Sequence, residues 1–169
     1  MLGKTTGIPF GDYHYTAPGP NIFGVPLLVP FGWWAFTLIA MSLPKRNKLF
    51  LAPLALVAWD LGLDPLMVSK DFWSFQSGGF YFGVPPSNFV GWYISGFMLV
   101  WILTKLEPKL RKDTPRTLHL VFAVQTFLMA FGLIVFFGMP LAGLVTFLAM
   151  GLCLLQTLKH KPTLALQRR

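Results

Sequence analysis

Five apolar stretches, each close to twenty residues long, occupy most of this chain. A helix needs about 20 predominantly apolar residues to cross the hydrocarbon core of a bilayer. Only 12% of the 169 residues are charged, whereas about a quarter is usual in soluble domains. The apolar side chains must therefore face lipid, and the sequence predicts an all-α, polytopic helical bundle, a single transmembrane domain over residues 1–169. We expect the spans at residues 22–43, 49–68, 88–106, 118–137 and 141–158.

The basic residues are distributed unevenly over the predicted connections. Lys and Arg number 14 against 6 Asp and Glu, which gives a formal net charge of +8. With five spans, all of them except Lys4 and Lys70 fall on the same side of the membrane, and cytoplasmic loops are the ones that carry such an excess. We therefore expect a multi-pass protein of the cytoplasmic (inner) membrane, in contact with membrane lipids and with no nucleic-acid partner. Its N-terminus would be extracytoplasmic and its C-terminus cytoplasmic.

Residues that commonly bind metals or cofactors are sparse. The single Cys153 lies inside an apolar span, and the three histidines, His14, His119 and His160, are far apart in the sequence. A di-iron desaturase or ketolase needs several histidine ligands and is therefore excluded. The chain also contains no Gly-rich dinucleotide loop and no phosphate-binding P-loop. We expect a reaction that uses neither a cofactor nor a metal.

Two segments of the chain repeat at an offset of 59 residues. FGVP at residues 23–26 is followed by GWW at 32–34, and FGVP at 82–85 is followed by GWY at 91–93. A weaker third copy, FGMP, stands at residues 137–140 before the last span. One explanation is local, because Gly permits a tight turn and Pro is tolerated in the first turn of a helix. The other is internal duplication, which is common in membrane proteins.

The second span contains two carboxylic acids in the sequence WDLGLDP at residues 59–65. Near the bilayer centre each acid costs about 2.5 to 3.5 kcal/mol of insertion free energy, so the rest of the bundle must hold this helix in the membrane. Their four-residue spacing places Asp60 and Asp64 on one helix face. Pro65 has no N–H and leaves the carbonyl of Leu61 without its usual donor, which opens a hydrogen-bonding position on the same turn.

This acid pair predicts acid catalysis in an apolar site. Two close carboxyl groups at low dielectric cannot easily both ionise, so one is expected to stay protonated at physiological pH. Such an acid can protonate an unactivated alkene, and the aromatic faces of Trp59 and Trp73 can stabilise the resulting carbocation. The alternative is that Asp60 and Asp64 only hydrogen-bond across helices or cap loops. Intramembrane carboxylates are functional by default, so we favour catalysis.

Further candidates lie in or next to the two long connections, the segment up to residue 21 and residues 69–87, which are predicted on the same membrane face. There His14 could relay protons or orient water, although a loop histidine is more often a surface hydrogen bonder. Asn88 could satisfy an Asp, bind water or cap its helix. The candidate substrate-binding residues are Asp12, Tyr13, Tyr15, Trp59, Trp73, Tyr81 and Asn88.

Four ordered blocks of the sequence resemble one known family. They are GIPFGDYHYT at residues 7–16, GPNIFGVP at 19–26, WDLGLDPLMV at 59–68 and GFYFGVP at 79–85. Together they are similar to the carotenoid biosynthesis membrane protein family, which includes carotenoid 1,2-hydratases of bacterioruberin and related pathways. The resemblance covers about the first two thirds of the chain, and the last two helices match mainly in hydropathy.

The resemblance implies hydration of the terminal 1,2 double bond of an acyclic carotenoid, such as a lycopene-like compound or a bacterioruberin precursor. Protonation at carbon 2 would give a tertiary cation at carbon 1, which water then captures without a cofactor. On this reading Asp60 or Asp64 is the acid, and the other carboxylate, with His14, positions the water.

Two other functions stay open at this point. Family members carry membrane sequence before the GIPFG block, which here begins at residue 7, so we expect either a shortened paralogue or an incomplete start. A shortened member could be a non-catalytic carotenoid-binding subunit of a larger membrane pigment–protein complex. The carboxylates and repeats alone would also suit a small transporter or proton channel.

Overall fold

The computed structural model describes residues 8–44, 47–111, 115 and 117–158, and this part of the chain is predominantly helical. It contains a helix at or near each of the five predicted spans, so the predicted fold class, an all-α bundle of apolar helices, is confirmed. The five α-helices are α2 (Leu28–Ser42), α3 (Lys48–Ser69), α4 (Pro86–Leu106), α5 (Thr117–Val135) and α6 (Pro140–Leu158). A short 3-10 helix, η1 (Pro108–Arg111), follows α4.

By length and composition, α3, α4 and α5 are able to cross a membrane, and α2 and α6 are shorter apolar helices in their described parts. The prediction that the first span begins at residue 22 is wrong, because α2 begins only at Leu28. The preceding residues form a hairpin of β2 (Asn21–Ile22) and β3 (Val25–Pro26). Residues 23 and 24 lie in the turn with positive φ, which ends any helix there.

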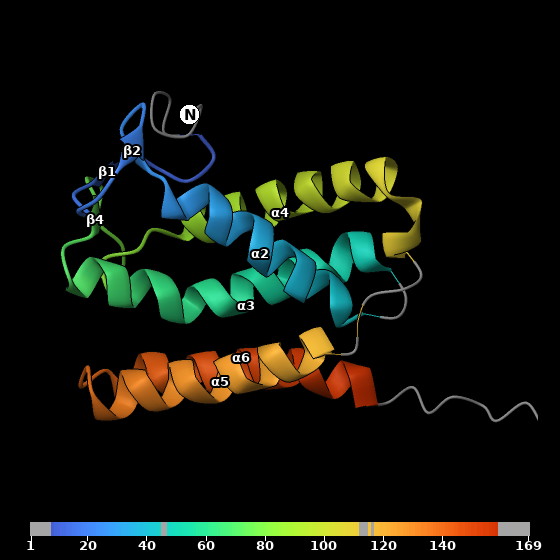
Figure 1. Ribbon diagram of the computed structural model, residues 1–169. Helices are drawn as coiled ribbons and strands as arrows, with labels where there is room; N and C mark the ends of the chain where they lie inside the picture. Colours follow the sequence, from blue (N-terminus) through green and yellow to red (C-terminus); the bar gives the residue numbers. More distant parts are fainter. Residues whose placement is uncertain (1–7, 45–46, 112–114, 116, 159–169) are drawn as a thin grey trace, which may run out of the picture.

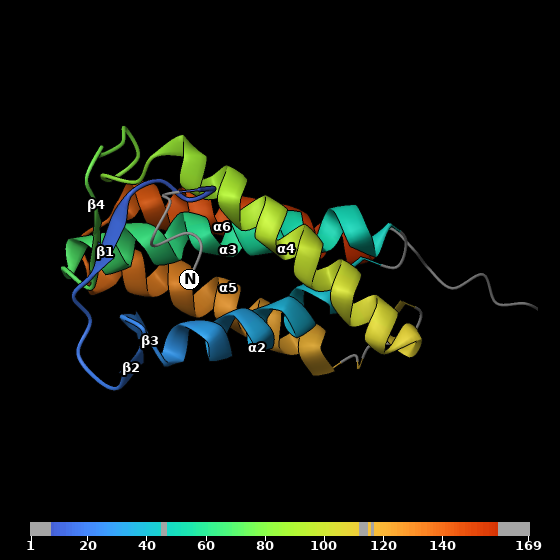
Figure 2. The same cartoon turned by 90° about the horizontal axis from the view of Figure 1, so that it is seen from above.

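The helices form layers around α3 (Figure 1). Helices α2 and α4 pack on one side of α3, and the α5–α6 hairpin packs on the other. The view from above shows α4 crossing over α3 at an angle, while α2 lies to one side of α3 (Figure 2). Within its apolar window α3 is 56% buried, compared with 28% for α4 and 22% for α5. The helix that carries both acids is therefore the central helix of the bundle.

Close approach to α3 depends on glycines at two contacts. A Cβ atom added to Gly62 would lie 2.7 Å from Thr146 Oγ1 of α6, and one added to Gly96 of α4 would lie 2.7 Å from Leu56 Cδ1. Small residues at membrane-helix interfaces let backbones approach closely, because packing rather than the hydrophobic effect drives association there. Gly62 stands between Asp60 and Asp64 in the sequence, but two residues turn a helix by about 200°, so the tight α3–α6 contact lies on the face of α3 opposite the acid pair.

A two-stranded sheet lies at one end of the bundle. The strand β1 (Tyr13–Tyr15) pairs antiparallel with β4 (Trp73–Phe75), with Tyr13 opposite Phe75 and Tyr15 opposite Trp73. The backbone N–H groups of the next two residues, 16 and 17, both donate to the Phe72 carbonyl at 2.9 Å. The two long connections that the sequence predicted on one membrane face thus meet in this sheet.

The first two sequence repeats adopt the same backbone turn. Phe23 and Gly24 have φ values of 54° and 73°, and Phe82 and Gly83 have 50° and 81°, as in the type I′ turns of hairpins. The third copy differs: Gly138, with φ 64°, follows the end of α5 at Val135, and the next N–H donates to the carbonyl of residue 133. Two copies thus share one backbone turn, as both the local explanation and internal duplication allow, while the third lies after a helix.

The described basic residues include several at the end opposite the sheet. Lys48, at the start of α3, donates from Nζ to the Leu110 carbonyl of η1 at 3.0 Å, whereas Lys70 follows the other end of α3. Most of the basic residues on which the predicted membrane orientation rests lie outside the described part of the chain. These are Lys4, Lys45, Arg46, Lys112, Arg116, Lys159, Lys161, Arg168 and Arg169.

We expect Gly62→Ala to destabilise the protein. The added methyl group would meet Thr146 and Met129 of two different helices at 2.7 to 3.0 Å, and such overpacking costs about 1–3 kcal/mol. Thermal unfolding of the purified protein in detergent measures this. The control is Gly151→Ala in α6, where an added Cβ meets nothing within 4 Å. Equal unfolding temperatures for the two variants would contradict the proposed packing.

Candidate functional site

The two acids of α3 lie side by side in the bundle interior. Asp60 is 0% exposed and Asp64 2% exposed, and both contact the side chain of Asn88, in the first turn of α4. The Asn88 amide Nδ2 donates to Oδ2 of Asp60 at 3.0 Å and to Oδ2 of Asp64. The spacing argument that placed both acids on one face is thus confirmed. Asn88 does not cap α4, because the N-cap position is held by Pro85 and Asn88 lies inside the first turn.

The two carboxyl groups have different surroundings. Asp64 lines a large cavity, whereas Asp60 lies outside its lining. The second oxygen of Asp60, Oδ1, is buried and has no hydrogen-bond partner among the described residues. Asn88 is neutral and supplies no compensating charge. The pair therefore consists of one acid that can touch a ligand and one that lies next to it, buried and away from the cavity.

The cavity has a volume of about 870 Å³ and lies between α2 and α4 against α3. Small-molecule sites commonly measure about 300–1,000 Å³. Its lining is polar at the end next to the β1–β4 sheet and apolar along the helices, where Thr37 donates its hydroxyl to the carbonyl of Trp33 at 2.6 Å. From Asn88 to Leu103 the lining follows α4 for 15 residues, or about 22 Å at 1.5 Å per residue. The shape suits a long apolar chain with one end at Asp64.

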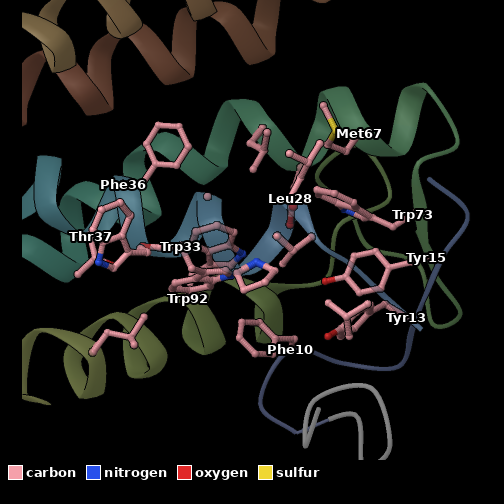
Figure 3. Close-up of a pocket in the computed structure, with 18 of the residues that line it drawn as sticks. Phe10, Tyr13, Tyr15, Leu28, Trp33, Phe36, Thr37, Met67, Trp73 and Trp92 are labelled. Carbon is pink, nitrogen blue, oxygen red and sulfur yellow. The ribbon is translucent and has the colours of Figure 1, made fainter. Parts of the chain in front are cut away.

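Stacked aromatic rings form the walls of the apolar part. Trp33 of α2 and Trp92 of α4 stack with ring centroids 4.0 Å apart and planes 20° apart. Phe36 and Trp59 lie 3.5 Å apart between centroids, and Trp59 meets Trp92 edge-on at 5.9 Å. Trp33 and Trp92 are equivalent positions of the sequence repeat. Figure 3 shows Trp33, Phe36 and Trp92 along the cavity, whose lining comes from α2, α3 and α4.

The β1–β4 sheet closes the polar end of the cavity. Because side chains alternate across a strand, Tyr13, Tyr15, Trp73 and Phe75 all face inward and line it. Tyr15 meets Trp73 edge-on at 5.7 Å, and the Trp73 side chain interacts with the Asp64 carboxyl. Burial is the main cause that raises the pKa of Tyr13 and of Tyr15, and the nearby acid adds to it. Both phenols therefore remain protonated at neutral pH.

The same alternation turns His14 away from the cavity. His14 is exposed, and its Nε2 lies 2.6 Å from the Gln76 side-chain nitrogen on the outer side of the sheet. Asp12 is also exposed, and its carbonyl accepts a hydrogen bond from the Gln76 N–H. The structure does not bring either residue to the acid pair, so nothing in this geometry supports their predicted roles.

Tyr81 occupies the hydrogen-bonding position that Pro65 opens in α3. Its hydroxyl donates to the carbonyl of Leu61 at 2.9 Å, and its ring lies outside the cavity lining. Burial, with a contribution from Asp60, raises the pKa of Tyr81 to about 12. Tyr81 thus supports the turn of α3 between the acids rather than contacting the cavity.

Several lining residues were not predicted. Trp33, Trp92 and Phe36 form much of the aromatic wall, and Phe10 packs on Gly91, where an added Cβ would meet its ring at 2.7 Å. The 59-residue repeat was the available signal for the two tryptophans, but a sequence cannot show that equivalent positions touch. Among the described residues, no group of three or more His, Cys, Asp or Glu could hold a metal ion.

Comparisons with known proteins identify relatives of the chain. A family model described as "Carotenoid biosynthesis protein" matches residues 1–154. A curated relative, the bisanhydrobacterioruberin hydratase of Haloarcula japonica, is 35% identical over 112 residues, covering 59% of this chain and 38% of the relative. The chain thus matches well under half of that relative's length. No solved structure matches the chain.

We expect Tyr81→Phe to lower the free energy of unfolding by about 0.5–1.5 kcal/mol, because it leaves the Leu61 carbonyl without a donor. In a Pro65→Ala background the same change should have a smaller effect, because residue 65 then supplies its own N–H to that carbonyl. Unfolding is measured in detergent solution for the unchanged protein, the two single variants and the double variant, and gives the coupling free energy between positions 81 and 65. Tyr93→Phe is the matched control, since that hydroxyl lies 3.5 Å from its acceptor. Equal losses in both backgrounds would disprove the link.

Proposed function

The chain belongs to the carotenoid biosynthesis protein family, and from this we propose that it hydrates the terminal 1,2 double bond of an acyclic carotenoid. A relative named as a hydratase supports a carotenoid-modifying enzyme. One observation carries the finer proposal: a buried carboxyl pair lies at the polar end of a long apolar cavity. A carotenoid is a long apolar substrate whose reactive bond is at its end, so this cavity suits it.

In the proposed first step, the Asp64 carboxyl group donates its proton to carbon 2 of the terminal bond. The positive charge then develops at carbon 1, a tertiary centre. The faces of Trp59 and Trp73, which line the cavity, stabilise this cation by cation–π interaction. Asp64 is the proposed acid, rather than Asp60, because it is the one that lines the cavity.

Asp60 and Asn88 are the proposed positioning residues for this acid. After proton transfer the Asp64 carboxylate keeps the N–H of Asn88 as a donor and the Trp73 side chain as a neighbour. Asp60 accepts the other N–H of the same amide, so the three side chains hold one another in place.

In the second step water attacks carbon 1 and loses a proton to the Asp64 carboxylate. The acid is regenerated, and the product is a tertiary alcohol. Water has added across the double bond with no net oxidation or reduction, so the proposed reaction needs no redox cofactor, and Asp64 supplies the proton.

The two other functions explain less of the geometry. A proton channel or transporter would use a continuous polar path, whereas the polar side chains of the described cavity lining cluster near Asp64, with Thr37 apart from them. A carotenoid-binding subunit would use the aromatic walls but has no need of two buried acids.

On the predicted orientation, we propose that the acid end of the cavity lies toward the extracytoplasmic face of the membrane.

We expect Asp64→Asn to lower hydration by about 10²–10⁴-fold, the usual contribution of a general acid. Asp60→Asn should lose less, because residue 60 does not line the cavity. Cells that accumulate lycopene and express each variant provide the test, with the product one water heavier measured by mass spectrometry. The control is Asp71→Asn, which changes an exposed Asp in the loop before β4. Undiminished product from Asp64→Asn, at equal membrane levels, would overturn the assignment.

The binding-subunit alternative predicts a different result for the unchanged protein. It would be purified with bound carotenoid, and well-inserted protein would leave the pigment composition of the cells unaltered. Hydrated product from preparations that contain no bound pigment would reject that alternative.

A further inference from the structure

The polar end of the cavity contains two hydroxyl groups that the proposed mechanism has not yet used. Tyr13 and Tyr15 project from β1, and Figure 3 shows both phenol oxygens directed into the cavity. Their rings meet edge-on, 5.2 Å apart between centroids. Both tyrosines line the same cavity as Asp64, whose carboxyl interacts with Trp73, the residue opposite Tyr15 in the sheet. They therefore belong to the same polar cluster as the proposed acid.

A water molecule in this cavity would have few places to bind. A buried water typically makes about three hydrogen bonds, within a range of two to four. Along the helices the lining is aromatic and aliphatic, and the Thr37 hydroxyl already donates to its own helix. Asp64, Tyr13 and Tyr15 together offer three polar partners at one end. The cavity thus combines an apolar channel along the helices with one site whose polar groups can hydrogen-bond a water molecule.

Resting on the proposed hydratase function, we propose that the hydroxyls of Tyr13 and Tyr15 hold the water that attacks the carbocation. The acid then comes from α3 and the water site from β1, where the two inward-facing tyrosines, rather than the outward-facing His14, hold the nucleophile. The inward face of β1 carries both tyrosines and its outward face carries the histidine.

The phenols position this water but do not deprotonate it. Burial raises the pKa of Tyr13 and of Tyr15, so each hydroxyl stays protonated and can both donate and accept a hydrogen bond. When the water oxygen bonds to carbon 1, its released proton goes to the Asp64 carboxylate, which gave up a proton in the first step. Atoms and charge balance, and both tyrosines end the cycle unchanged.

The position of the water determines whether the cation is hydrated or loses a proton. A carbocation next to the Asp64 carboxylate can be captured by water, or it can return a proton from carbon 2 or an adjacent methyl group and become an alkene again. In heavy water the second route leaves deuterium in the recovered carotenoid. Hydration and deuterium exchange therefore report on the two halves of the reaction separately.

The test is Tyr15→Phe in membranes that contain the full chain, with an acyclic carotenoid supplied in heavy water. Phe keeps the ring that packs on Trp73 and Tyr13 and removes only the hydroxyl. We expect hydration to fall by about tenfold or more, because the water loses its orientation, while deuterium uptake into the recovered substrate persists. Tyr13→Phe should act in the same direction. The matched control is Tyr93→Phe outside the cavity, which should change neither readout.

The other outcomes overturn the water site in distinguishable ways. If Tyr15→Phe and Tyr13→Phe both leave hydration unchanged, the hydroxyls do not hold the water, and the hydratase proposal still stands. If hydration and deuterium uptake fall in parallel, the tyrosines serve the acid or the fold. If the unchanged protein shows neither hydration nor uptake, the proposed function fails and the water site fails with it.

Discussion

Two carboxyl groups buried in an apolar bundle have to be satisfied by the protein itself, because lipid offers them nothing. Asn88 meets this need with one amide that donates to both Asp60 and Asp64. The arrangement requires the first turn of α4 to face the middle of α3. It therefore fixes how these two helices pack, and the cavity between α2 and α4 opens beside that contact.

The cavity joins two kinds of structure with different tasks. The helices supply long apolar walls, where Trp33 stacks on Trp92, and the small β1–β4 sheet supplies the closed polar end. In membrane proteins, non-helical backbone is tolerated at such a place when it is buried in protein or lines a cavity. The sheet also brings together residues far apart in the sequence, since Tyr15 lies opposite Trp73.

The helix-based part of the site was predictable and the strand-based part was not. Helical periodicity alone placed Asp60 and Asp64 on one face. The role predicted for His14 rested on its position beside two tyrosines on the membrane face where Asp64 emerges. A strand, however, points neighbouring residues to opposite sides, and the pairing of β1 with β4 is a long-range contact that no local pattern reveals. The first span was predicted to begin too early because residues 23–24 are in an apolar stretch of sequence, yet their φ values are those of a turn and not of a helix.

The order of residues along the chain has a consequence for biogenesis. A nascent chain delivers α3 to the insertion machinery before α4, so both acids reach the bilayer while their common donor, Asn88, is still 24 residues or more behind. Until then the helix bears roughly 2.5 to 3.5 kcal/mol of unfavourable transfer free energy for each acid. Insertion of α4 then supplies the donor that both acids lack, so packing of α4 against α3 stabilises α3 in the lipid.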